Sequence, residues 1–388
     1  MFFPASVLQG VNYQIDPVVM NDGIYNTWTV TSDFGTYETT GDERLLVLLR
    51  EIAAIAAIRA QSGIVRFGES AAQAGLGTLE KAKTILENPV GTVTGLPQGA
   101  ARFLGRVGQT IQHATQGTLD VPTDGGAGAV AQQFLGVDKA KRVLAAQLGV
   151  NVYSKNAALQ SALNDAAWTM AMGQLTFKVG TSLLLPFAAG MTITGVNVVS
   201  SLTQEQIEAS PKELMESVRG QFAALGVAPD VINALCDNPD YDPWSLASMA
   251  NSLQAVGASG ADLFAAKASS ATTELDAYYF VRVASLLVQY GKSQSPITAV
   301  ESAGASVVCR DASNRLVVPL WADYIEWTPN LDRASARLLE RAQAEGRAGT
   351  VIYATGRWSP SASTVMESRG IAIPHAASDL PANDACGR

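Results

Sequence analysis

One serine of the chain stands where a catalytic nucleophile could lie. The stretch Phe67-Gly68-Glu69-Ser70-Ala71 is similar to the Gly-x-Ser-x-Gly turn of carboxylesterases, in which two glycines relieve close backbone contacts. Here Ala72 replaces the second glycine, and the sequence has no His-Gly-Gly-Gly run for an oxyanion hole. His375 and an acid could complete a triad in the esterase chain order. A serine hydrolase that uses Ser70 and His375 is therefore the alternative, and we favour a protein without catalytic residues.

A second candidate lies near the C-terminus, where Thr350 to Ala354 predict a buried strand. Gly356 gives the backbone freedom after this strand, and Ser359 followed by Pro360 predicts the start of a helix. Unpaired N–H groups at a helix start, aided by a guanidinium group, suit an anion. Thr355, Gly356, Arg357 and Ser359 thus form a candidate anion-binding site. An ordinary strand-to-helix connection with a salt-bridged Arg357 is the simpler interpretation.

The run Gly291-Lys292-Ser293 has the ending of a phosphate-binding loop, but Leu286 occupies the position of its first glycine. We expect Gly291 to terminate a helix that begins near residue 261. The stretch DNPDYDP, residues 237 to 243, groups three aspartates as a calcium loop would. It lacks the glycine and closing glutamate of an EF-hand, so we expect a solvated turn between helices.

Metal and cofactor sites are not indicated. The chain has two histidines, which excludes a multi-histidine metal site, and we expect no cofactor. Cys236, Cys309 and Cys386 form no Cys-x-x-Cys pair. One disulfide with a free thiol and three free thiols both remain open.

Composition indicates a folded acidic protein. Of 388 residues, 47% are hydrophobic and 16% charged, and the net charge is −8. The basic residues are scattered along the chain, so we expect no nucleic-acid partner.

Periodicity predicts a mainly α protein with a small α/β part. Alternation around Asp33-Phe34-Gly35 predicts an N-terminal β-hairpin segment over residues 1–41. Helical spacing begins at Asp42 and predicts a bundle-like helical domain over 42–298, including a helix that Ser210 caps. Strands alternating with helices predict a C-terminal α/β lobe with a parallel strand pair over 299–377, and 378–388 predict a mobile tail.

Two segments could contact a membrane. Residues 88–117 are rich in small residues, and 179–204 contain no charge over a length that could span a bilayer. Pro186 and several glycines and hydroxyl residues interrupt the second segment, which favours a buried helical hairpin. A membrane- or lipid-interacting protein is therefore a second alternative.

Three stretches, ENPVGTVTGLPQGAARFLGRVG, LGVDKAKRVLAAQLGVNVYSKN and TGRWSPSASTVMESRG, resemble a family of exported bacterial proteins without an assigned function. The resemblance implies export and identifies no catalytic residue. The opening MFFPASVLQG has no basic n-region, and we expect a mature chain whose export signal was removed. Our hypothesis is a non-catalytic periplasmic or envelope-associated binding or scaffold protein with an unspecified protein or small-molecule partner.

Overall fold

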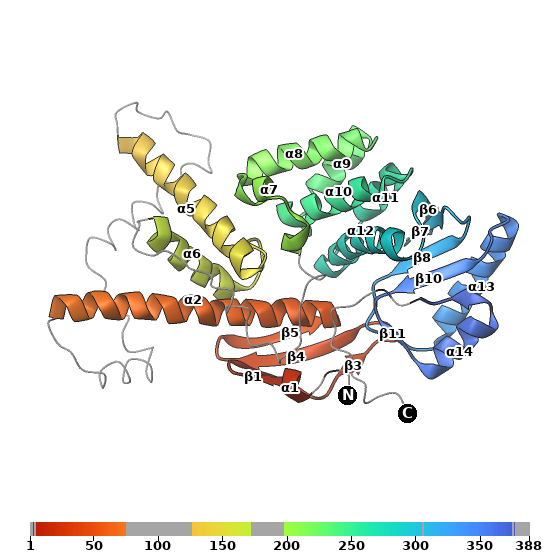
Figure 1. Ribbon diagram of the computed structural model, residues 1–388, viewed down its shortest axis with the longest axis horizontal. Coiled ribbons are helices and arrows are strands. Elements are labelled where there is room, and N and C mark those ends of the chain that lie inside the picture. The colour runs from red at the N-terminus through yellow and green to blue at the C-terminus, as the bar shows by residue number, and fades with distance from the viewer. Residues whose placement is uncertain are drawn as a thin grey trace.

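The computed structural model describes residues 5–74, 126–171, 198–304 and 306–374, together with Phe3 and Ala376. This part of the chain is mainly helical, with one five-stranded sheet before the helices and another after them (Figure 1). The prediction of a mainly α protein with an additional α/β part is confirmed at this level.

The predicted hairpin forms part of the N-terminal sheet, and its first strand also pairs with β2 and β3. Strand β4 pairs antiparallel with β5, and Gly35 at the turn has a φ of +140°. Along β4 the buried side chains alternate, so Trp28 and Val30 face the core. Three further strands complete this sheet. The sequence did not predict them, because they are only two or three residues long and too short to show alternation. The elements are α1 (Ala5–Leu8), β1 (Gln9–Gly10), β2 (Tyr13–Ile15), β3 (Met20–Asn21), β4 (Asn26–Ser32) and β5 (Gly35–Thr40).

Helix α2 (Asp42–Ala74) lies between two hydrophobic cores. Leu45, Leu49 and Ile52 pack with Trp28 against the sheet. The following turns contribute Ile55 to the larger core, which they share with the helices above α2 in Figure 1. The predicted helix is thus confirmed, and its apolar stripe serves both layers.

The helical region contains short, capped helices. Ser210 and Glu213 form the predicted reciprocal capping box at the start of α8. The single helix expected from residue 261 is wrong: the chain breaks into α11 and α12, and Thr273 caps the second helix. Gly291 lies inside α12, so its predicted role as the residue after the helix is also wrong. The helices are α5 (Gly126–Leu148), α6 (Ala157–Ala171), α7 (Gln204–Glu208), α8 (Pro211–Ala224), α9 (Pro229–Cys236), α10 (Pro243–Val256), α11 (Ala261–Ala268) and α12 (Glu274–Ser293), with a short 3-10 turn at Val198–Ser201.

The C-terminal sheet is mixed. Its order is β12-β10-β8-β7-β6, with the first three strands parallel and the last three antiparallel, which confirms the predicted parallel pair. The larger core runs from α2 through α12 into this sheet and includes Tyr290 and Tyr353, so it crosses residue 298. The elements are β6 (Ile297–Ala303), β7 (Ser306–Asp311), β8 (Leu316–Leu320), β9 (Tyr324–Ile325), α13 (Pro329–Ala344), β10 (Thr350–Ala354), β11 (Arg357–Trp358), α14 (Pro360–Ser368) and β12 (Ile371–Ala372).

Within the described ranges, none of the helices combines the length and apolarity that crossing a bilayer requires. The segment 88–117 and most of 179–204, which the sequence offered for membrane contact, lie outside those ranges.

Candidate functional site

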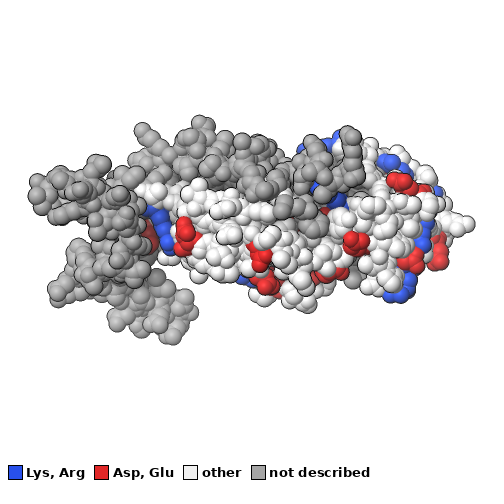
Figure 2. Space-filling view, turned by 90° about the horizontal axis from the view of Figure 1, so that it is seen from below, with Lys and Arg blue, Asp and Glu red and all other residues white. Residues whose placement is uncertain are grey.

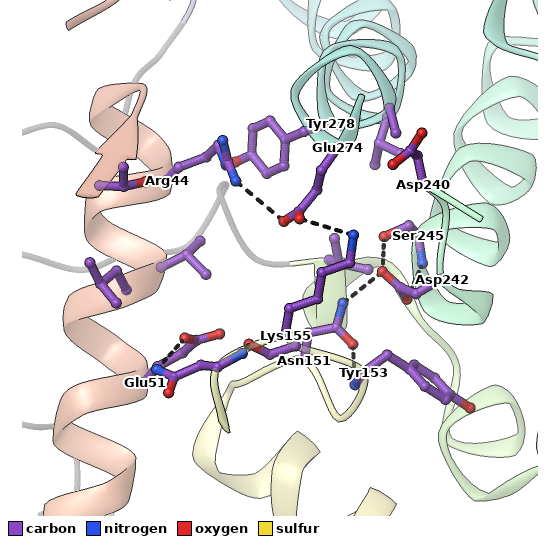
Figure 3. A pocket seen from close by; sticks show the side chains of 18 of the residues that line it. Arg44, Glu51, Asn151, Tyr153, Lys155, Asp240, Asp242, Ser245, Glu274 and Tyr278 are labelled. Atoms are coloured by element: carbon purple, nitrogen blue, oxygen red, sulfur yellow. Dashed lines mark hydrogen bonds and ion pairs between the residues drawn. The ribbon is translucent and has the colours of Figure 1, made fainter. Parts of the chain in front are cut away.

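A cavity of about 610 Å³ opens where three parts of the chain meet. One wall is formed by β5 and the first turns of α2, a second by the loop 149–157, and a third by the starts of α10 and α12 (Figure 3). Long stretches of sequence separate these three parts of the chain. The lining combines apolar side chains with polar groups and charges of both signs.

Glu51 is the buried carboxylate of this cavity. Its residue is 6% exposed, and its Oε2 accepts a hydrogen bond of 3.0 Å from the side-chain amide of Asn156. Burial raises the pKa of Glu51, and the hydrogen bonds from Ser154 and Asn156 lower it in part. Both donors come from the loop between α5 and α6. The loop between α5 and α6 therefore holds the carboxyl group of Glu51 at the edge of the cavity.

A second acidic group organises the opposite wall. Asp242 caps α10 through the backbone N–H groups of Trp244 and Ser245, at 2.9 and 3.0 Å. Its other oxygen accepts from the amide of Asn151 at 3.0 Å and from the Ser245 hydroxyl at 2.5 Å. This cap consequently ties the α5–α6 loop to α10, as Figure 3 shows.

Ion pairs cross the mouth of the cavity. Glu274, at the start of α12, lies 3.2 Å from Arg44 of α2 and 3.2 Å from Lys155 of the loop (Figure 3). The lining carboxylates outnumber the lining cations. The carboxylates are Glu38, Glu51, Asp240, Asp242 and Glu274, and the cations are Arg44, Arg50 and Lys155. A positively charged group that enters the cavity would meet an excess of negative charge.

The residues predicted for anion binding lie in the C-terminal region, away from this cavity. The Thr355 hydroxyl donates to the backbone carbonyl of Ala322 at 2.7 Å and accepts from its N–H at 3.0 Å. Ser359 caps α14 as predicted, through Ala362, and both Thr355 and Ser359 are buried. The polar side chains of these two residues thus already have partners within the protein.

Gly356 and Arg357 of the same stretch border a buried carboxyl pair. A side chain at Gly356 would lie 2.7 Å from the backbone oxygen of Asp323, and the N–H of Arg357 donates to that oxygen at 2.9 Å. The Asp323 carboxylate accepts from the backbone N–H groups of Asn26 and Asp42, both at 2.8 Å. Burial raises the pKa of Asp42 to about 6, and burial with the Asp42 charge raises that of Asp323 to about 8.

The catalytic alternative falls partly outside the described ranges. Ser70 lies within helix α2, near its end, and His375 is outside the described residues. Cys236 and Cys309 are free thiols, and Cys386 is also outside these ranges. Over the described ranges no group of three or more acidic, histidine or cysteine side chains could hold a metal ion.

Charges on the described part of the face seen in Figure 2 are mixed, with lysines and arginines scattered among aspartates and glutamates.

Sequence reasoning found the turn that contains Asp240 and Asp242 but missed Glu51, Asn151 and Asn156. The available signal was the pair of asparagines in the turn GVNVYSKN, because asparagine side chains order turns.

Comparisons with models of protein families, with curated proteins and with solved structures found no match to this chain.

Proposed function

We propose that this protein is a non-catalytic binding protein that takes a small molecule with a cationic group into the cavity between α2, α10 and α12. The observation that supports this most is Glu51, a carboxyl group that is 6% exposed and lines an open cavity. Neutral donors hold it in place. A ligand cation beside it would offset the cost of burying its charge.

The position of the cavity also favours ligand binding. Its walls come from elements that contribute side chains to the two cores, and the 149–157 loop supplies amide and hydroxyl groups. Ligand pockets of this kind combine apolar walls with a few fixed polar groups. Here Leu46 and Val281 supply apolar contacts beside Glu51 and Asn151.

The bacterial envelope, and the periplasm in particular, is the proposed location. This part of the proposal is supported by the resemblance to exported proteins alone. It is tested by locating the protein in periplasmic, membrane and cytoplasmic fractions of the bacterium that makes it.

The ligand class is tested by calorimetric titration with putrescine, choline and free arginine at constant ionic strength, with succinate as an anionic comparison. We expect at least one cation to bind and succinate not to bind. Glu51→Gln keeps the hydrogen bond from Asn156 but removes the charge, and should weaken cation binding about tenfold, or ~1.4 kcal/mol. The matched control is Glu340→Gln, because Glu340 is exposed on α13 and outside the cavity.

The proposal fails if none of the three cations binds at millimolar concentration. It also fails if Glu51→Gln and Glu340→Gln bind the same cation with the affinity of the unaltered protein.

A further inference from the structure

A second cavity, of about 360 Å³, contains polar groups that lack partners. It lies between α5, the α5–α6 loop, α6 and the first residue of α8. Tyr153 lines both cavities, and in Figure 3 its hydroxyl points away from Asn151 and the ion pairs of the larger one. The residues that line it are Asp138, Lys141, Arg142, Val152, Tyr153, Gln160 and Pro211.

Two of these side chains have a buried donor without an acceptor. Arg142 is 6% exposed and donates one Nη2 hydrogen bond of 3.0 Å to the backbone oxygen of Glu208. Its Nε has no partner among the described residues, and neither has the hydroxyl oxygen of Tyr153. Leaving such a group unsatisfied costs about 1–3 kcal/mol, and more for a charged one. Each such group calls for an explanation, and a bound ion is one that fits donors lining a cavity.

Lys141 adds a third donor. Its ammonium group donates to the side-chain oxygen of Gln160 at 2.7 Å, and the Gln160 amide nitrogen is fixed by the backbone oxygens of Val152 and Ser154. One acceptor leaves two ammonium hydrogens for another group. Burial lowers the pKa of Lys141, and the charge of Asp138 partly opposes this.

The charge balance of the lining is positive, because Lys141 and Arg142 face a single carboxylate, the exposed Asp138. Two further carboxylates near α8 are already engaged. Glu208 pairs with Lys139 at 2.6 Å, and Glu213 accepts from the backbone of its helix cap. These bonds keep both carboxylates paired with donors of their own.

We propose that the smaller cavity is a binding site for a small oxyanion, such as phosphate, sulfate or the carboxylate of a metabolite. The oxyanion accepts from Arg142, the Tyr153 hydroxyl and the Lys141 ammonium, and it supplies the partner that the Arg142 Nε and the Tyr153 hydroxyl lack within the described residues. Hydrogen bonds between charged groups of this kind are about twice as strong as neutral ones. The site shares Tyr153 and the α5–α6 loop with the cation-binding cavity but takes a ligand of opposite charge.

Tyr153→Phe is the most informative variant. The ring packs edge-on against Trp244, with centroids 5.9 Å apart at 89°, and phenylalanine keeps this contact. Since the hydroxyl has no partner within the described residues, its removal should leave the unliganded protein at least as stable. It should nevertheless weaken anion binding.

The test uses inorganic phosphate as the probe, in calorimetric titration and thermal unfolding at constant ionic strength in chloride. We expect phosphate to bind and to raise the midpoint of unfolding. Tyr153→Phe and Arg142→Lys should each weaken binding about tenfold or more, because each loses a hydrogen bond to a charged ligand. Lys212→Gln, which removes an exposed cation of α8 outside the cavity, should bind phosphate as the unaltered protein does.

Vesicles of phosphatidylglycerol distinguish the source of the anion. If the protein floats with these vesicles, and both free phosphate and Tyr153→Phe abolish the flotation, the site binds a lipid headgroup. If the protein binds phosphate but does not float, the site binds a free anion. The proposal is overturned if neither phosphate nor sulfate binds at millimolar concentration. It is equally overturned if Tyr153→Phe and Lys212→Gln bind phosphate with the same affinity.

Discussion

The buried carboxyl pair of Asp42 and Asp323 predicts that the folded protein loses stability as the pH rises above about 5. Both groups have a pKa above the usual aspartate value of 3.8, about 6 for Asp42 and about 8 for Asp323. At pH values between 3.8 and about 8 the folded state therefore binds more protons than the unfolded state. Stability falls with pH wherever this is so.

The size of the effect follows from the number of protons. One extra proton in the folded state changes the free energy of unfolding by about 1.4 kcal/mol per pH unit. The pair holds about two extra protons near pH 5 and about one near pH 7, so we expect a loss of roughly 4 kcal/mol over this range. Carboxylates with lowered pKa values, such as Glu208 and Glu345, act in the opposite sense, because their stabilisation is lost as the pH falls below about 4. The stability maximum should therefore lie near pH 4, where these two opposing effects balance.

Asp42→Asn isolates the pair. The asparagine side-chain oxygen can still accept the hydrogen bonds that Asp42 receives from Asn26 and Trp28, at 2.9 and 2.8 Å. Because the Asp42 charge raises the pKa of Asp323, its removal should lower that pKa and flatten the pH profile. The variant should thus gain stability relative to the unaltered protein as the pH rises.

Urea unfolding followed by tryptophan fluorescence at pH 5, 6, 7 and 8 measures these profiles. Asp230→Asn is the control, because Asp230 also lies in a first helical turn but is exposed. The reasoning is refuted if the free energy of unfolding of the unaltered protein stays level or rises from pH 5 to pH 7. A profile of Asp42→Asn parallel to that of the unaltered protein would refute it as well.

Three further predictions concern stability. Arg282→Met should destabilise the protein by about 3–5 kcal/mol in urea unfolding, because Glu43 loses both of its hydrogen bonds from Arg282, of 2.5 and 2.7 Å, in a buried site. Adding Glu43→Met should restore part of the loss, and an additive double variant would contradict this. Gly291→Ala should stabilise by about 0.5–1 kcal/mol, since the added carbon meets nothing within 4 Å inside α12. Gly356→Ala should instead destabilise the protein, because the added carbon would lie 2.7 Å from backbone oxygens. For Gly291→Ala, a melting temperature below that of the unaltered protein would contradict the helical position.

Local signals in the sequence predicted much of the fold. The alternation on both sides of Asp33-Phe34-Gly35 predicted the hairpin of β4 and β5, and the Ser210 and Ser359 caps predicted the starts of α8 and α14. The caps depend on residues three positions apart, and the hairpin depends on two strands that adjoin a single turn, so short-range hydrogen bonds and steric limits determine them. The break between α11 and α12 was missed because apolar residues continue with helical spacing on both sides of it.

The sequence by itself determined the order and type of most elements, the acidic charge and the absence of a multi-histidine site. Tertiary structure alone decided which polar side chains share a cavity. Glu51, Asn151, Asp242 and Glu274 meet because α2 and α12 pack into one core, and no local pattern encodes that packing. The reason is physical: periodicity states which face of a helix is apolar, but the partner of that face is set by the fit of distant side chains.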